Sequence, residues 1–211
     1  MAILTVMGMD LSWADLVGGR LCLDFVNTVG SRLRAEPPPN EHLNDYASLV
    51  AWAGHAGAID EPLGKKLARK ASAHPREAAA IVEEAKSLRE ALYRTFLAAA
   101  EDRPPAAADL ARFNAHWARA VAAPRILFGD DGWAVDFARG DALTAPLDPV
   151  LRSAAELLLA DDRYRVRLCE SDDGCGWLFI DQTKSRTRRW CDMKVCGNRA
   201  KARRHYARQK G

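Results

Sequence analysis

Four cysteines crowd the C-terminal end of this chain and constrain its fold more than any other feature. Cys169 and Cys175 form one close pair, and fifteen residues later Cys191 and Cys196 form a second. Each pair can turn its thiolates toward one point if the chain between the pairs folds back as a hairpin. Four soft ligands in a closed tetrahedron suit a structural ion rather than a catalytic one. The spacing therefore predicts one structural Zn²⁺ held by these four cysteines.

Two other interpretations of the cysteines stay open at this point: a pair of disulfides, and four unrelated core residues. Disulfides belong to exported proteins, and the first 17 residues lack the basic start and long apolar stretch of a secretory signal. We therefore expect a cytoplasmic protein with reduced thiols. Cys22 stands in the apolar run Leu21–Leu23 and is expected to be a core residue.

The charge of the chain is divided sharply between its two ends. Residues 183–211 contain eleven basic residues and one acidic residue, a net charge of +10. Residues 1–182 contain twenty basic residues and 27 acidic ones, a net charge of −7. An acidic body with a strongly basic tail indicates two modules, the second with a polyanionic partner.

The hydrophobic pattern predicts an α+β protein. Ile81, Ala85, Leu88, Leu92 and Phe96 recur at the spacing of one helix face within the longest predicted helix. Helices are expected over residues 44–56, 60–72, 74–100, 105–122, 148–160 and 198–209, a β-hairpin over 125–137, and strands over 164–168 and 176–180 with a returning segment at 189–191. Residues 20–28 are expected to form a strand or a buried segment.

This pattern divides the chain near Asp161. Residues 1–161 form a mostly helical domain with a small sheet, and residues 162–211 form a zinc treble clef of knuckle, hairpin and helix. No apolar run reaches the roughly 18 residues of a membrane-spanning helix.

Three stretches of the C-terminal part, Cys175–Asp181, Arg188–Met193 and Cys196–Tyr206, closely resemble the bacterial CGNR zinc-finger family. The motif Cys196-Gly197-Asn198-Arg199 that names the family is intact. Residues 23–28 and 49–53 resemble the ABATE domain that is joined to that finger. The resemblance implies a stress-responsive transcription regulator with a DNA-binding treble clef, an α+β domain that senses a ligand, and the four cysteines as zinc ligands.

The basic tail is the candidate nucleic-acid surface. Neutralising phosphates releases counterions, so such a surface gains affinity for nucleic acid and loses it with salt. We expect contacts from Lys184, Arg186, Arg188, Arg189, Arg199, Arg203, Arg204 and Arg208. One helix face should pack on the hairpin through Ala202 and Tyr206, and Arg199 has an alternative role inside the finger. A solvated surface, RNA binding, and docking of an acidic protein partner are the alternatives.

The N-terminal domain offers a weaker hypothesis. Asp24, Asn27 and Thr28 place polar groups in an apolar segment and could line a ligand pocket with Trp52. The alternative is that backbone groups satisfy them inside the fold. No catalytic motif is recognised, and the five histidines are scattered, so we expect no enzyme. The sequence leaves open whether a small-molecule effector binds and whether the chain forms a homodimer.

Overall fold

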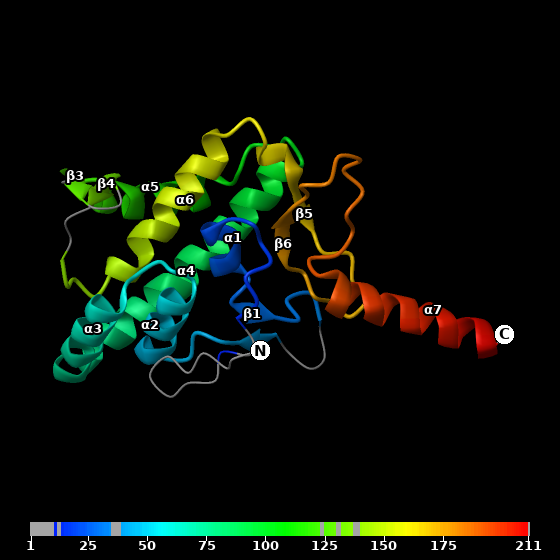
Figure 1. The fold of residues 1–211 in the computed structure, drawn as a ribbon, viewed down its shortest axis with the longest axis horizontal. Helices are drawn as coiled ribbons and strands as arrows, with labels where there is room; N and C mark the ends of the chain where they lie inside the picture. The colour runs from blue at the N-terminus through cyan, green and yellow to red at the C-terminus, as the bar shows by residue number, and fades with distance from the viewer. Residues whose placement is uncertain are drawn as a thin grey trace.

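The computed structural model describes residues 11, 14–34, 39–122, 125–129, 132–136 and 140–210. The α+β prediction is confirmed, because within these residues helices dominate and three two-stranded antiparallel sheets accompany them (Figure 1). The helices are α1 (Leu21–Val26), α2 (Tyr46–His55), α3 (Glu61–Ala73), α4 (Pro75–Ala100), α5 (Ala107–Ala120), α6 (Asp148–Leu159) and α7 (Asn198–Lys210). The strands are β1 (Val29–Gly30), β2 (Asn40–Glu41), β3 (Arg125–Gly129), β4 (Gly132–Asp136), β5 (Val166–Leu168) and β6 (Leu178–Ile180).

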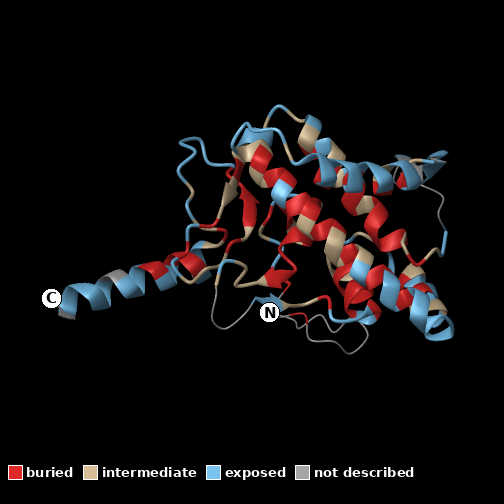
Figure 2. Ribbon diagram, turned by 180° about the vertical axis from the view of Figure 1, so that it is seen from behind, coloured by how far each residue is buried: buried red, intermediate tan, exposed pale blue. Residues whose placement is uncertain are grey.

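Helix α4 is the central element of the body. Its predicted apolar face is buried from Ile81 to Phe96, and α1, α2, α3, α5 and α6 pack around it. The helix starts are specified locally: Asp45 and Ser48 form a capping box on α2, and Asp60 caps α3. Figure 2 shows the buried residues gathered along the facing sides of these helices. Among the described helices, none is long and apolar enough to cross a membrane.

The segment at residues 20–28 is buried, as expected, but its core is helix α1 rather than a strand. Cys22, Phe25 and Val26 are buried at helical spacings of three and four residues. The ring of Phe25 packs 5.4 Å from that of Trp52. A short segment such as Leu21–Val26, apolar except for Asp24, fits a strand or a buried helix equally well from the sequence, so only tertiary packing decides between them.

The main hydrophobic core continues past residue 161 into the first hairpin of the C-terminal part. Val166, Leu178 and Ile180 belong to the same buried cluster as Leu23 and Leu88. Strand β5 lies against α4 and β6 lies against α1. The β5–β6 hairpin is therefore packed into the helical body rather than tethered to it.

The predicted hairpin at residues 125–137 is present as β3 and β4, with Phe128 opposite Trp133. Its turn residues 130 and 131, and residue 137, lie outside the described residues. Ile126, Phe128 and Trp133 are all exposed.

Helix α7 extends away from the body at one end of the molecule (Figure 1). Of its described side chains, Ala200 alone is buried. The prediction that Ala202 and Tyr206 pack on the hairpin is wrong, because both are exposed. Residues 189–191 return without forming a strand, held instead by a hydrogen bond from the Glu170 N–H to the Arg189 carbonyl at 2.9 Å.

Candidate metal centre and basic surface

The four C-terminal cysteines converge from four separate positions of the chain. Cys169 follows β5 and Cys175 precedes β6, so the β5–β6 hairpin presents both of them at its tip. Cys191 lies in the coil that returns from the basic loop. Cys196 lies in the π-helical turn η4 (Met193–Gly197), directly before α7. The segment from Cys169 to Cys175, here called the knuckle, and the start of the last helix thus face one point.

The sulfur atoms have the spacing of a tetrahedral thiolate site. All four Sγ atoms lie within 4.8 Å of one another. The Sγ of Cys191 is 3.7 Å from that of Cys175 and 3.7 Å from that of Cys196. A zinc–sulfur bond of about 2.3 Å gives a tetrahedron with an edge of about 3.8 Å, whereas a disulfide needs about 2.05 Å. All five cysteines are free thiols, so the disulfide interpretation is wrong and the cluster fits one soft cation.

The thiols also influence one another electrostatically. Hydrogen bonding with the Cys169 thiol raises the pKa of Cys175 and of Cys191, and burial adds to both effects. Hydrogen bonding with neighbouring thiols lowers the pKa of Cys169 and, on balance, that of Cys196. Two of the four thiols therefore resist ionisation beside the other two, and a divalent cation would relieve this repulsion. Cys22 is separate from this group: it is fully buried, and burial raises its pKa to about 12, as expected of a core residue.

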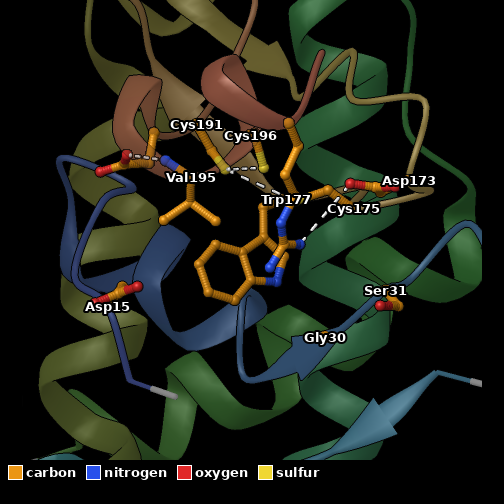
Figure 3. A pocket seen from close by; sticks show the side chains of 11 residues that line it. Asp15, Gly30, Ser31, Asp173, Cys175, Trp177, Cys191, Val195 and Cys196 are labelled. Carbon is orange, nitrogen blue, oxygen red and sulfur yellow. Dashed lines mark hydrogen bonds and ion pairs between the residues drawn. The ribbon is translucent and has the colours of Figure 1, made fainter. Parts of the chain in front are cut away.

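A small cavity adjoins the cysteines (Figure 3). It has a volume of about 180 Å³. Trp177 and Val195 line it from the finger, and Asp15, Gly30 and Ser31 line it from the N-terminal part. The candidate metal centre is therefore bordered directly by residues of the N-terminal part of the chain.

Backbone hydrogen bonds join the knuckle to the segment that follows β1. The N–H of Arg32 donates to the Cys175 carbonyl at 3.0 Å, and the N–H of Leu33 donates to the Gly174 carbonyl at 2.9 Å. Gly174 has a φ of +69°, and a Cβ placed on it would lie 2.9 Å from the Arg34 nitrogen. Only glycine allows this close approach.

Two side chains complete the attachment of the knuckle. The Trp177 Nε1–H donates to the Val29 carbonyl at 2.8 Å, and the Tyr93 hydroxyl donates to the Gly176 carbonyl at 3.0 Å. The knuckle is thus held by β1 and by α4 together.

The basic loop at residues 183–189 is organised by the buried carboxylate of Asp181. It accepts hydrogen bonds from the Thr183 N–H at 2.9 Å and from the Arg188 N–H at 3.0 Å. Burial alone would raise the pKa of Asp181, but these bonds and that of the Thr183 hydroxyl outweigh it and hold the pKa below its usual value. The loop therefore has a defined conformation.

Arg188 is directed into the finger rather than toward a partner. Its guanidinium donates to the carbonyls of Trp190 and Cys191, and it stacks 4.4 Å from the centroid of the Phe179 ring. The expectation that Arg188 contacts nucleic acid is therefore not supported by its position. These contacts connect the basic loop to the return segment and to β6.

The other predicted basic residues whose side chains the structure describes are exposed, and some of them have partners within the chain. Lys184 and Arg208 are exposed, Arg186 stacks on the Tyr164 ring, and Arg189 pairs with Glu170 at 2.6 Å. Arg204 lies in α7, but its side chain lies outside the described residues.

Arg199 and Arg203 share one face of α7, as the helical spacing predicts, and both pair with Asp173 of the knuckle. Arg34, from the first domain, faces the same carboxylate at 3.8 Å. Sequence reasoning missed both Arg34 and this role of Asp173. No local signal could have found them, because the three arginines meet only in the folded chain.

The four residues predicted to line a ligand pocket are used inside the fold. Asn27 and Thr28 are buried, and both bond to backbone carbonyls, while Trp52 is buried in the core. Asp24 accepts a hydrogen bond from the Gly18 N–H at 2.8 Å. Their geometry favours the structural alternative. A surface hollow of about 440 Å³ between α2, α3 and α4 is lined by other residues, among them Tyr46 and Val82.

Comparison with known proteins agrees with this architecture. The ABATE family model, described as a putative stress-induced transcription regulator, matches residues 19–161. The model of the CGNR zinc finger matches residues 165–209, which include all four cysteines. A search of the curated proteins finds no match to this chain.

Proposed function

The chain belongs to the ABATE family and ends in a CGNR zinc finger, and from this premise we propose that it regulates transcription by binding duplex DNA through its C-terminal helix and basic loop. One Zn²⁺ ion, bound by Cys169, Cys175, Cys191 and Cys196, holds the finger together. DNA contact comes from α7 and from the exposed arginines and lysine of residues 183–189.

The donor set and its spacing support zinc as the ion. Four cysteine sulfurs within 4.8 Å of one another, with two of the pairs at 3.7 Å, fit a closed tetrahedral site with no open position for substrate. When bound, the ion supplies neutralisation of the thiolates and a cross-link between the knuckle and the turn before α7. The fold of the chain directs α7 away from the body, starting at that turn.

The observation that carries the DNA-binding proposal is the exposure of α7. Beyond Ala200 the described side chains of this helix are exposed, and its contacts with the body there are polar ones such as the pairing of Arg203 with Asp173. Such a helix gains little stability from apolar packing. Yet α7 carries Arg199, Lys201, Arg203, Arg204 and Arg208, spread around its circumference. A groove lined by phosphates offers charge to every side of such a helix.

The chemistry on this surface favours phosphate contacts over base reading as the main source of affinity. Lys184, Arg186 and Arg208 are exposed cations that can neutralise phosphates. A guanine can be read by an arginine only where the helix enters the major groove. We therefore propose that most of the binding free energy is independent of sequence, and that α7 supplies the selectivity.

The decisive experiment is fluorescence anisotropy of the zinc-loaded chain with a labelled duplex DNA, titrated through salt. We expect binding at low salt and a logarithmic salt slope of about −0.9 for each phosphate contacted. A duplex RNA of the same sequence is the parallel arm, because its deep major groove excludes a helix. Absence of DNA binding at low salt would overturn the proposal and favour an acidic protein partner. Equal affinity for the RNA would overturn the assignment to DNA.

A further inference from the structure

Asp173 lies at the meeting point of three arginines from two distant parts of the chain. Its side chain is only 16% exposed, and it belongs to the knuckle between Cys169 and Cys175. Its carboxylate is 3.8 Å from Nη2 of Arg34 and 3.8 Å from Nη1 of Arg199, and it also pairs with Arg203. One negative charge is therefore shared by three guanidinium groups, and the cluster keeps a net charge of +2.

The three arginines surround a cleft that is open to solvent. Its volume is about 370 Å³, and Ala202 and Tyr206 form the rest of its wall on α7. Arg34, Arg199 and Arg203 are 36%, 62% and 43% exposed, so their outer donors remain accessible to a ligand. Excess positive charge, several guanidinium donors and an open approach are the chemical requirements of a phosphate site.

Arg34 is held in this cluster by the backbone and not by its charge alone. Its Nε–H donates to the carbonyl of Asp173 at 3.2 Å, and the preceding residue, Leu33, is bonded to Gly174. A residue from the region matched by the ABATE model is thereby fixed beside the finger helix.

We propose that Arg34, Arg199 and Arg203 form one site for a backbone phosphate of the nucleic acid, and that Asp173 occupies this site until the phosphate displaces it. The inference rests on the proposed function, and it adds a residue of the first domain to the DNA-binding surface. Asp173 then acts as an internal competitor that lowers the affinity of the free protein for any polyanion.

A purely structural role makes the opposite prediction. If Asp173 only anchored α7, its removal would loosen the helix and weaken DNA binding. If Asp173 competes with phosphate, its removal strengthens binding, because three arginines are released from an internal carboxylate.

The chain offers matched controls for both variants. Asp172 precedes Asp173, is exposed and has the same charge, so D172N removes the same charge from the finger. Arg69, exposed on α3 in the helical body, is the control for Arg34, so R69Q removes one positive charge away from the cluster. Circular dichroism and zinc content establish that each variant is folded.

Anisotropy with a labelled duplex at fixed salt is the first test. D173N should bind the duplex about fivefold more tightly than D172N does. R34Q should bind it about fivefold more weakly than R69Q does, and the salt slope of R34Q should be smaller in magnitude by about one. Equal affinities within each pair, while the unmodified chain binds, would overturn this site and leave the proposed function intact. If neither the unmodified chain nor D173N binds DNA, both proposals fail.

A second test separates nucleic acid from free phosphate as the source of the ligand. Thermal unfolding of the unmodified chain and of R34Q is measured with inorganic phosphate alone, at constant ionic strength. We expect phosphate to shift both melting temperatures equally. A shift that disappears in R34Q, together with DNA binding that does not depend on Arg34, would reassign the site to free phosphate and overturn the proposal. If D173N fails to fold, the comparison of R34Q with R69Q decides alone.

Discussion

The carboxamide of Asn27 pairs with both backbone groups of Leu178, accepting from its N–H and donating to its carbonyl, each at 2.9 Å. The two residues are 151 positions apart, and both are buried. Asn27 thus takes the place of a neighbouring strand for β6. This bond, together with the packing of β6 on α1, makes the hairpin of the finger a part of the helical body.

Replacement of Asn27 by alanine should therefore destabilise the whole chain. Both backbone groups of Leu178 would be left buried without a partner, at a cost of about 2–4 kcal/mol in the free energy of unfolding. Urea denaturation followed by circular dichroism measures the loss. Asn114 is exposed on α5, so N114A is the control. It should change the free energy of unfolding by less than about 0.5 kcal/mol. A loss in N27A no larger than that of the control would contradict the role assigned to Asn27.

Loss of one cluster thiol should abolish zinc binding and lower the thermal stability of the whole chain. In C191S the closed tetrahedron loses a ligand, and the knuckle that Arg32 and Leu33 hold loses its cross-link to α7. Metal analysis should find about one zinc per unmodified chain and none in C191S. C22A removes a thiol from the core and should keep its zinc. Full zinc content in C191S would show that the cluster is not the metal site.

Gly174 should tolerate alanine much less well than Gly57 does, although both have a φ of +69°. At Gly57 no atom lies within 4 Å of the added methyl group. G57A should therefore lower the free energy of unfolding only by the cost of a left-handed backbone, about 1–2 kcal/mol. At Gly174 the methyl group would also lie 2.9 Å from the Arg34 nitrogen. We expect G174A to lose at least about 1 kcal/mol more than G57A in thermal or chemical denaturation. Equal losses would mean that the contact between the knuckle and Arg34 gives way easily.

Asp24 should make the chain less stable as the pH rises from about 4 to about 6. Burial raises the pKa of Asp24 from 3.8 to about 6, against the opposing effect of the Gly18 N–H. Because the folded pKa exceeds the unfolded one, the protonated form favours folding, and this stability is lost as the carboxyl ionises. The asparagine in D24N stays neutral.

The advantage of D24N over the unmodified chain should therefore grow by about 2–3 kcal/mol between pH 4 and pH 7. Denaturation curves at a series of pH values measure this difference directly. A difference that does not change with pH would show that Asp24 is ionised without cost in the folded chain.

The features that could be predicted from the sequence depend on local pattern. The face from Ile81 to Phe96 specifies α4 by its spacing alone, and the cysteine pairs specify their cluster because thiols at that spacing have few other uses. Capping residues such as Asp60 mark where a helix begins.

The features that could not be predicted depend on contacts between distant segments. Arg188 and Arg186 look alike in a basic run, yet only Arg188 finds the Phe179 ring and the carbonyls of the return segment. Tyr206 has the spacing of a packed residue on α7, but the hairpin does not extend far enough to cover it. The convergence of Arg34 on Asp173 depends on how the whole chain folds.

The outward course of α7 gives the molecule a large electric dipole along its longest axis. The segment that ends in this helix carries a net charge of +10, and the rest of the chain carries −7 (Figure 1). In the field of a polyanion, such a molecule turns its helix toward the surface before contact and keeps its acidic body away. The charge separation therefore acts on the rate and the orientation of an encounter with a polyanion, before any specific contact forms.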